Sequence, residues 1–266
     1  MNNLLVSAAM AALIPCVGIA QDVSDLVSAS LLPGWQTEAG THMAALRLDL
    51  APGWKTYWRA PGEAGIPPEF DWSGSENVRG VTLHWPRPVV FHTNGMQSVG
   101  YHDQLVLPIE ITKTAEGKPV SIALTVDFGV CSDICVPARI SVTGALPLLG
   151  EGDPLIRAAL ADQPKDGRAA GVERISCRVE PLKDGMRVTA TLAMPPMGKA
   201  ETVVLETTQG DIWVSEATTR REGGKLTASV DMIDPTGVPF ALARDRVVVT
   251  VLSGAKAFEL RGCPSD

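Results

Sequence analysis

Residues 120–137 read VSIALTVDFGVCSDICVP, and this stretch decides the fold. Its first part alternates apolar with polar side chains, which is the period of a half-buried β-strand. The apolar members are Val120, Ile122, Leu124, Val126 and Phe128. A fully extended strand would hold the sulfurs of Cys131 and Cys135 roughly 13 Å apart, at about 3.3 Å per residue, which no disulfide bridges. The chain must therefore fold back over Ser132-Asp133-Ile134, a loop short enough for a hairpin with both cysteines at its mouth.

The same alternation recurs along both halves of the chain. It runs over 46–50 (LRLDL) in the first half, and over 186–192 (MRVTATL) and 226–232 (LTASVDM) in the second, where each run follows a glycine turn. Residues 247–252 form an apolar run suited to a central strand, followed by another strand near 258–260. Many short strands separated by Gly and Pro turns predict an all-β protein with a sandwich in each half.

The boundary between the halves is predicted near residue 150, where residues 146–154 read LPLLGEGDP. Asp153 can cap a helix that has Pro154 at its first position, and a short apolar face follows up to Gln163. The residues of that face are Leu155, Ile156, Ala159 and Leu160. We therefore expect a short linker helix, a first sandwich over 21–149 and a second over 150–266.

The amino terminus has the features of a secretory signal. Residues 4–14 form an apolar run too short to span a bilayer, and Gly18-Ile19-Ala20 is a small-x-small cleavage pattern. Cys16 raises the alternative of a lipoprotein, but Pro15 stands where a small residue would precede a lipidated cysteine. We expect residues 1–20 to be removed. No later stretch approaches eighteen uninterrupted apolar residues, so we expect an exported, soluble chain without stable membrane insertion.

Four cysteines remain after residue 20, an even number that predicts disulfides in an exported chain. Of the three possible pairings, proximity favours Cys131 with Cys135, which leaves Cys177 for Cys263. The second bridge would tie the ends of the second sandwich together, a structural role worth roughly 4 to 5 kcal/mol by chain entropy. The formal net charge of -7 and pI near 5.2 argue against nucleic acid or an anionic membrane surface as a partner.

The surroundings of the first pair differ from those of a thioredoxin-type site. Such sites place Cys-x-x-Cys at a helix N-terminus, which lowers the thiol pKa. Here Pro137 and the alternating residues 139–142 continue as strand, and Asp133 in the loop disfavours a thiolate. We expect ordinary or raised pKa values for Cys131 and Cys135, and rapid exchange only with a docked partner. Alkylation rates measured against pH should reveal no thiol pKa well below 7.

Three segments occur in the order found in a known family: 53–62 (GWKTYWRAPG), 100–109 (GYHDQLVLPI) and 129–135 (GVCSDIC). They resemble the N-terminal periplasmic domain of the thiol:disulfide interchange protein DsbD, and more closely its ScsB-type relatives. The resemblance covers roughly residues 26–146. It extends more weakly into the second half, where ScsB-like proteins also carry a second β domain.

This resemblance implies an immunoglobulin-like sandwich and a redox role as a thiol:disulfide oxidoreductase without a cofactor. Cys131 and Cys135 match the family's redox pair. The pair would receive electrons from a membrane transporter of the DsbD or CcdA type and pass them to periplasmic thioredoxin-like proteins, a chemistry also used in cytochrome c biogenesis. The relatives continue into transmembrane helices and a thioredoxin-like domain, and we expect that separate proteins supply both here or else that this chain does not perform the full relay.

The resemblance also implies a loop that covers the disulfide until a partner docks. The corresponding segment is Phe91-His92-Thr93-Asn94-Gly95-Met96, in which Met96 or Phe91 would shield the sulfurs because the tip has no aromatic residue. Tyr57 and Tyr101 either bond near the sulfurs or are ordinary buried tyrosines. The sequence leaves open which cysteine is attacked first, the direction of electron flow, the identity of donor and substrate, and the oligomeric state.

Two other classes of function remain as alternatives. His92, Met96 and His102 lie in a short stretch that would suit Cu(I) together with the thiolates. However, no His-x-x-His or Met-x-x-Met spacing is present and an oxidised pair binds nothing, so we predict no metal site. The remaining alternative is a β-sandwich binding module whose disulfides are inert.

Overall fold

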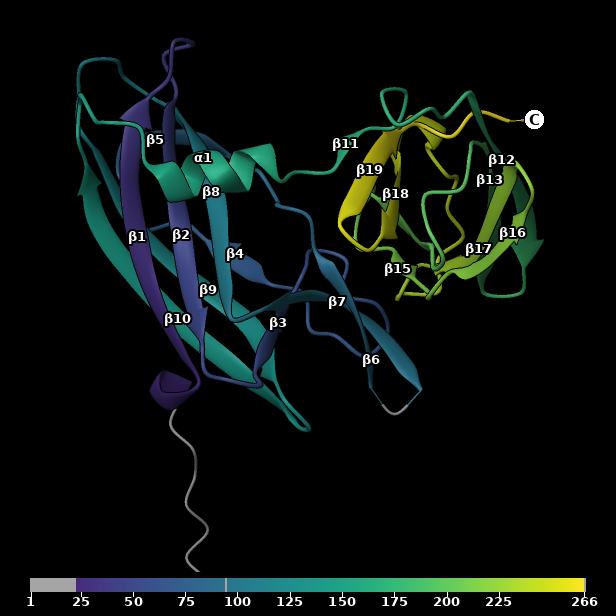
Figure 1. Ribbon diagram of the computed structural model, residues 1–266. Helices are drawn as coiled ribbons and strands as arrows, with labels where there is room; N and C mark the ends of the chain where they lie inside the picture. Colours follow the sequence, from purple (N-terminus) through teal and green to yellow (C-terminus); the bar gives the residue numbers. More distant parts are fainter. Residues whose placement is uncertain (1–22, 94, 266) are drawn as a thin grey trace, which may run out of the picture.

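The alternating segments form β-strands in both halves of the chain, in a computed structural model that describes residues 23–93 and 95–265. Two β-sandwiches lie beside each other (Figure 1). The fold class is therefore all-β, as predicted. The expected signal sequence, Cys16 and Asn94 lie outside the described residues. Within those residues, no helix has the length and apolar character needed to cross a membrane.

The first sandwich follows a short 3-10 turn, η1 (Val23–Asp25), and has two antiparallel sheets. The strands of one sheet, in spatial order, are β1 (Val27–Gln36), β2 (His42–Leu50), β8 (Gln104–Lys113) and β5 (Val78–Leu83). The strands of the other are β10 (Cys135–Leu146), β9 (Val120–Cys131), β3 (Lys55–Tyr57), β7 (Met96–His102) and β6 (Val89–Thr93), with β4 (Glu69–Asp71) also paired to β9. The apolar side chains of β9 that alternate in sequence are all buried in the core between these sheets.

The expected linker helix is α1 (Pro154–Ala161), and it packs on the first sandwich. The carboxylate of Asp153 accepts hydrogen bonds from the N–H groups of Leu155 and Ile156 at its start. Ile156 and Ala159 are buried against β2 and β8 (Figure 1). The outer face of that sheet is therefore covered, which explains why β2 is buried along most of its length.

The second sandwich also has two sheets. One contains, in order, β11 (Lys165–Asp166), β19 (Lys256–Arg261), β18 (Val247–Ser253) and β14 (Thr202–Thr207). The other contains β12 (Arg174–Leu182), β13 (Gly185–Ala193), β17 (Lys225–Ile233) and β15 (Trp213–Val214), with β16 (Thr218–Glu222) also on β17 and a 3-10 turn, η2 (Arg244–Arg246), before β18. Cys177 and Cys263 form the expected disulfide, with Cα atoms 5.4 Å apart and both residues buried.

Strand β18 is buried along its whole length because both of its faces are covered. Val247, Val249 and Val251 point into the core of the second sandwich. On the opposite face Leu252 joins the core cluster of the first sandwich, together with Ala257 of β19. The two sandwiches therefore share an apolar interface built on the sheet that contains β14, β18 and β19.

Candidate functional site

The hairpin predicted around the first cysteine pair is present. Strand β9 ends at Cys131, β10 begins at Cys135, and these two residues are cross-strand partners. The turn between them includes a hydrogen bond from the N–H of Ser132 to the carbonyl of Ile134. The sulfurs form a disulfide whose Cα atoms lie 4.2 Å apart. The disulfide therefore sits at the mouth of the hairpin, at one end of the sheet.

The two cysteines differ in exposure. Cys131 is only 1% exposed, since β9 runs between β10 and β3 and Cys131 pairs with Lys55 of β3 on its other side. Cys135 is exposed, because β10 is the edge strand of its sheet. Ile134, at the tip of the loop, is 72% exposed. An incoming molecule therefore meets Ile134 and Cys135 before it meets Cys131.

Tyr57 is the side chain that holds the disulfide from within the sheet. Its hydroxyl lies 2.9 Å from Sγ of Cys131 and 3.1 Å from Sγ of Cys135, and 3.3 Å from the carbonyl oxygen of Ala64. A disulfide sulfur has no hydrogen, so the phenol is the donor, and its single hydrogen is shared among three acceptors. Burial raises the pKa of Tyr57, which keeps the hydroxyl protonated at neutral pH.

Gly129 makes room for this arrangement. A Cβ atom at this position would lie 2.9 Å from Cβ of Ile66 and 3.0 Å from the Tyr57 ring, so no larger residue fits without a shift. The side chains of Tyr57 and Ile66 therefore both pack closely against β9 at Gly129, two residues before Cys131. A glycine inside a strand often marks such a close approach of other atoms. Gly129 is therefore the feature of the sequence from which the contact with Tyr57 and Ile66 could be inferred.

Residues 60–67, which we call the cover loop, lie against Tyr57. They contribute the Ala64 carbonyl that accepts from the hydroxyl and the Ile66 side chain over Gly129. A Cβ atom at Gly65 would clash with Pro61 and the Tyr57 ring, so this loop is also tightly packed. The motif that contains Tyr57 is evident in the sequence. The sequence does not predict, however, that the cover loop contacts the disulfide site.

The segment expected to cover the disulfide forms the β6–β7 hairpin. In its sheet, β7 lies next to β3 and β6 lies beyond it, and the residue of β7 that is level with Lys55 and Cys131 is His102, at the end of β7 away from the β6–β7 turn. Lys55 stands between, with its Nζ 3.2 Å from the hydroxyl of Thr93 and 4.9 Å from the centre of the Phe91 ring. Burial lowers the pKa of Lys55.

Three described residues of that segment, His92, Gly95 and Met96, are exposed, and Met96 is 54% accessible. In the part of the chain that the structure describes, the hydrogen-bonding contact of both sulfurs comes from Tyr57 and not from this hairpin. A covering role for residues 91–96 stays a prediction, whereas the cover loop is already in contact with the site.

Tyr101 belongs to the core. Its hydroxyl donates to the carbonyl of Pro86 at 2.8 Å, and its ring stacks on Trp85 with centroids 6.3 Å apart. Burial raises its pKa well above the usual value. Tyr101 is therefore the ordinary buried tyrosine of the two alternatives, and Tyr57 is the one that bonds to the sulfurs.

The copper alternative gains no geometric support. Among residues 23–93 and 95–265, no group of three or more His, Cys, Asp or Glu side chains is placed to hold a metal ion. His102 instead pairs with the carboxylate of Asp103, with Nδ1 2.5 Å from Oδ2, and its ring packs edge-on against Phe91.

Comparison with known proteins finds similarity in both sequence and fold. Residues 28–146, from β1 to the end of β10, match the family described as thiol:disulfide interchange protein DsbD, N-terminal. No curated protein sequence matches the chain. Among solved structures, the N-terminal periplasmic domain of ScsB from Proteus mirabilis superposes with a TM-score of 0.65 at 22% identity, over 93% of this chain and 97% of that one. The resemblance of the first sandwich to the DsbD N-terminal domain, which its motifs predicted, is therefore confirmed, and the chain as a whole has the fold of the ScsB domain.

Proposed function

We propose that this chain is a periplasmic thiol:disulfide exchange protein that passes electrons between a membrane reductase and thioredoxin-like partners through Cys131 and Cys135. The observation that carries the proposal is a hairpin disulfide with one exposed cysteine, one buried cysteine and a phenol hydroxyl against both sulfurs. The family of the first sandwich supports this chemistry. The expected signal sequence and the description of the ScsB relative as periplasmic support the compartment.

The exposure of the cysteines selects the point of attack. A partner thiolate must reach one sulfur of the disulfide and displace the other. Cys135 is exposed on an edge strand, whereas Cys131 is closed in by β3 and β10. The partner sulfur therefore bonds to Sγ of Cys135, the bond between Cys131 and Cys135 breaks, and Cys131 leaves as a thiolate.

Tyr57 assists this step at the leaving sulfur. A thiolate at a buried position is poorly solvated, which makes it costly to form. The Tyr57 hydroxyl, 2.9 Å from Cys131, is already placed to donate to the developing negative charge. Hydrogen bonds to ionised groups are about twice as strong as neutral ones, so this contact strengthens as the bond breaks.

The second step completes a two-electron transfer. The Cys131 thiolate takes up a proton, and the second thiolate of the partner attacks the partner sulfur in the mixed disulfide, so that Cys135 leaves. The products are an oxidised partner and a reduced pair that has gained two electrons and two protons. The reverse sequence passes the electrons to the next acceptor.

Trapping of the mixed disulfide tests the proposal. In Cys131→Ser the exposed Cys135 can attack a partner disulfide but nothing resolves the product, so a covalent complex that reductant releases should accumulate in the periplasm. Its mass identifies the partner. Cys135→Ser should trap far less, because the remaining thiol is buried, and Cys177→Ser/Cys263→Ser, which removes the second bridge without freeing a thiol, serves as a control outside the site.

Two outcomes would contradict the proposal. One is that neither variant forms a complex that reductant releases. The other is that the wild-type disulfide stays oxidised when it is incubated with reduced thioredoxin-like proteins and glutathione. Either result would favour the inert sandwich with stapling disulfides.

A further inference from the structure

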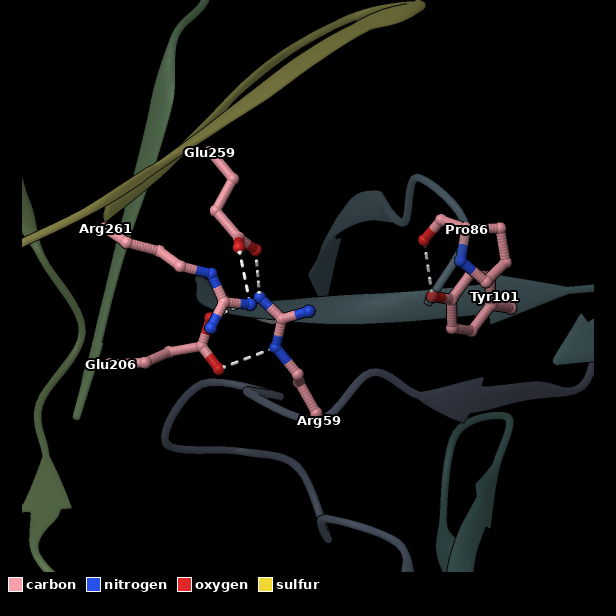
Figure 2. A network of polar contacts seen from close by, with 6 residues as sticks. All are labelled: Arg59, Pro86, Tyr101, Glu206, Glu259 and Arg261. Carbon is pink, nitrogen blue, oxygen red and sulfur yellow. Dashed lines mark hydrogen bonds and ion pairs between the residues drawn. The ribbon is translucent and has the colours of Figure 1, made fainter. Parts of the chain in front are cut away.

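A partly buried ion-pair network joins the two sandwiches close to the site. The guanidinium of Arg59 binds both carboxylate oxygens of Glu206 on β14, with Nε and Nη2 each 2.9 Å from an oxygen, and Nη2 lies 2.6 Å from Glu259 on β19 (Figure 2). The side chains are only 26%, 17% and 17% exposed. Arg261 adds a contact to Glu259 at 3.2 Å. Bidentate geometry of this kind fixes direction as well as distance.

The network is held in place on the side of the first sandwich too. The Arg59 guanidinium stacks over the ring of Trp58, which is fully buried, at 4.3 Å from the ring centre. The backbone N–H of Trp58 donates to the backbone carbonyl of Val99. Burial alone would lower the pKa of Arg59, but the charges and hydrogen bonds of Glu206 and Glu259 together raise it. Arg59 is therefore a fixed cation between the sandwiches.

Arg59 lies two residues after Tyr57, and the cover loop begins at the next residue, Ala60. The cover loop has its own tie to the second sandwich, since the carboxylate of Glu63 accepts a hydrogen bond from the N–H of Glu216 at 3.2 Å. A cleft lined by both sandwiches separates most of the loop from residues 203–207 and 212–217. The loop is therefore fastened by Arg59, just before its start, and by Glu63, and both precede Ala64, whose carbonyl accepts from the Tyr57 hydroxyl.

We infer that Arg59 is a positioning residue through which the second sandwich holds the Tyr57 hydroxyl against the sulfurs and so sets the reduction potential and exchange rate of Cys131 and Cys135. The inference rests on the proposed function. Release of Arg59 frees the end of β3 and the start of the cover loop. The hydroxyl then loses its fixed position, so it donates less well both to the thiolate that forms at Cys131 as the disulfide opens and to the Cys131 sulfur of the reduced pair. The pair becomes harder to reduce.

The test removes the three partly buried charges together, in the variant Arg59→Met/Glu206→Gln/Glu259→Gln. Arg261 loses its contact with Glu259, but its side chain is 74% exposed and stays hydrated. Reduction by dithiothreitol should slow about tenfold, and the equilibrium constant for reduction should fall about tenfold, which is about 30 mV for a two-electron couple. The matched control is Arg221→Met/Glu201→Gln. That pair has the same bidentate geometry, at 2.8 and 2.6 Å, but lies within the second sandwich. The control should keep the wild-type potential and rate.

A double-mutant cycle with Tyr57→Phe separates positioning from general loosening of the fold. If Arg59 acts through the hydroxyl, neutralising the network changes the potential little in a chain that already carries Tyr57→Phe. Glu63→Ala, which loosens only the cover loop, should move the potential in the same direction by a smaller amount. This variant also provides the test if the triple variant does not fold.

The inference is overturned if the network variant, or Glu63→Ala in its place, keeps the wild-type potential and rate, or if the effect persists undiminished with Tyr57→Phe. These failures differ from a failure of the proposed function. In the latter case the wild-type chain itself would not exchange with thioredoxin-like proteins, whereas here the wild-type chain exchanges normally and the variants show that Arg59 does not position the Tyr57 hydroxyl.

Discussion

At the scale of single residues, the two cysteines of the hairpin disulfide have unlike surroundings. Cys135 faces solvent on an edge strand, and Cys131 is enclosed with the Tyr57 hydroxyl at 2.9 Å. This asymmetry assigns them different roles, with Cys135 as the attacked sulfur and Cys131 as the leaving and resolving one. The rate of exchange should then depend on the single hydroxyl of Tyr57.

Tyr57→Phe removes that hydroxyl and keeps the ring over Gly129. Hydrogen bonds to charged groups contribute about 1.5 to 3 kcal/mol, and a loss of 1.4 kcal/mol in the transition state is about tenfold in rate. We expect reduction by a thioredoxin-like protein to slow at least about tenfold in stopped-flow fluorescence. Tyr101→Phe is the matched control, because its hydroxyl bonds to Pro86 in the core. Equal rates of reduction for Tyr57→Phe and wild type would show that the Tyr57 hydroxyl does not assist the exchange.

Gly129→Ala tests the close packing over β9. The new Cβ would lie 2.9 Å from Ile66 and 3.0 Å from the Tyr57 ring, and overpacking of this kind costs about 1 to 3 kcal/mol. We expect a loss of stability of that size in urea unfolding, together with slower reduction of the disulfide. Gly80→Ala is the control, because nothing lies within 4 Å of a Cβ there. A Gly129→Ala protein as stable as the control would show that Tyr57 and Ile66 do not press on β9.

At the scale of elements, strands that are covered on both faces lose the alternation of a half-buried strand. β2 is covered by α1 on its outer face, and β18 is covered by the first sandwich. The apolar run at 247–252 is explained in this way, since Val248, Thr250 and Leu252 are buried as well as the valines of the inner face. Residues at the ends of such strands are buried too, and His42, at the start of β2, is one of them.

His42 makes stability depend on pH. Its Nε2–H donates to the carbonyl of Pro33 at 2.6 Å, and its pKa is lowered from 6.5 mainly by burial, with the charge of Lys113 acting in the same direction. Below 6.5 the unfolded chain binds a proton that the folded chain does not, so the free energy of unfolding falls as pH drops from 6.5 towards the folded pKa. Above 6.5 the residue makes no difference to the pH dependence.

Urea unfolding of wild type and His42→Gln between pH 7.5 and 5 checks this expectation. The wild-type free energy should fall with acidification across that window, and the variant should show a flatter profile. His92→Gln is the control, because His92 is exposed. Parallel profiles for wild type and His42→Gln would contradict the assignment. Carboxylates with lowered pKa values, such as Glu110 with its hydrogen bonds from Thr41 and His84, contribute to the loss of stability only at lower pH.

At the scale of the whole molecule, the sheet that contains β14, β18 and β19 serves both sandwiches. Its inner face packs in the core of the second, and its outer face carries Leu252 and Ala257 into the core of the first. The same outer face carries Glu206 and Glu259 to Arg59. The second sandwich is therefore part of the environment of the disulfide site. The stability that its own disulfide gives it should nevertheless be separable from the redox chemistry.

Cys177→Ser/Cys263→Ser tests that separation. The bridge joins residues 86 apart in sequence, for which chain entropy gives about 4 to 5 kcal/mol of stability. We expect the second sandwich to lose stability of that order in urea unfolding, while the folded variant reduces Cys131 and Cys135 at the wild-type rate. A change of potential in the folded variant would instead show that this bridge takes part in the exchange.

Much of this protein follows from its sequence alone. Period-two alternation predicts the strands, a three-residue gap between cysteines requires the hairpin, and Asp153-Pro154 starts the helix. These features depend on local geometry, on turn length and on side-chain period, which a short window of sequence contains. The boundary at 149/150 stays a prediction, and α1 belongs by its packing to the first sandwich.

Tertiary structure decided the rest, namely which cysteine is exposed, which side chain touches the sulfurs and what fastens the site. Tyr57 reaches Cys131 across 74 residues of sequence, and Arg59 reaches Glu206 and Glu259 across 147 and 200. Contacts of such separation arise only when complete sheets pack, so no local pattern encodes them. The physical reason is that burial and hydrogen bonding at the disulfide depend on strands that are neighbours in space and remote along the chain.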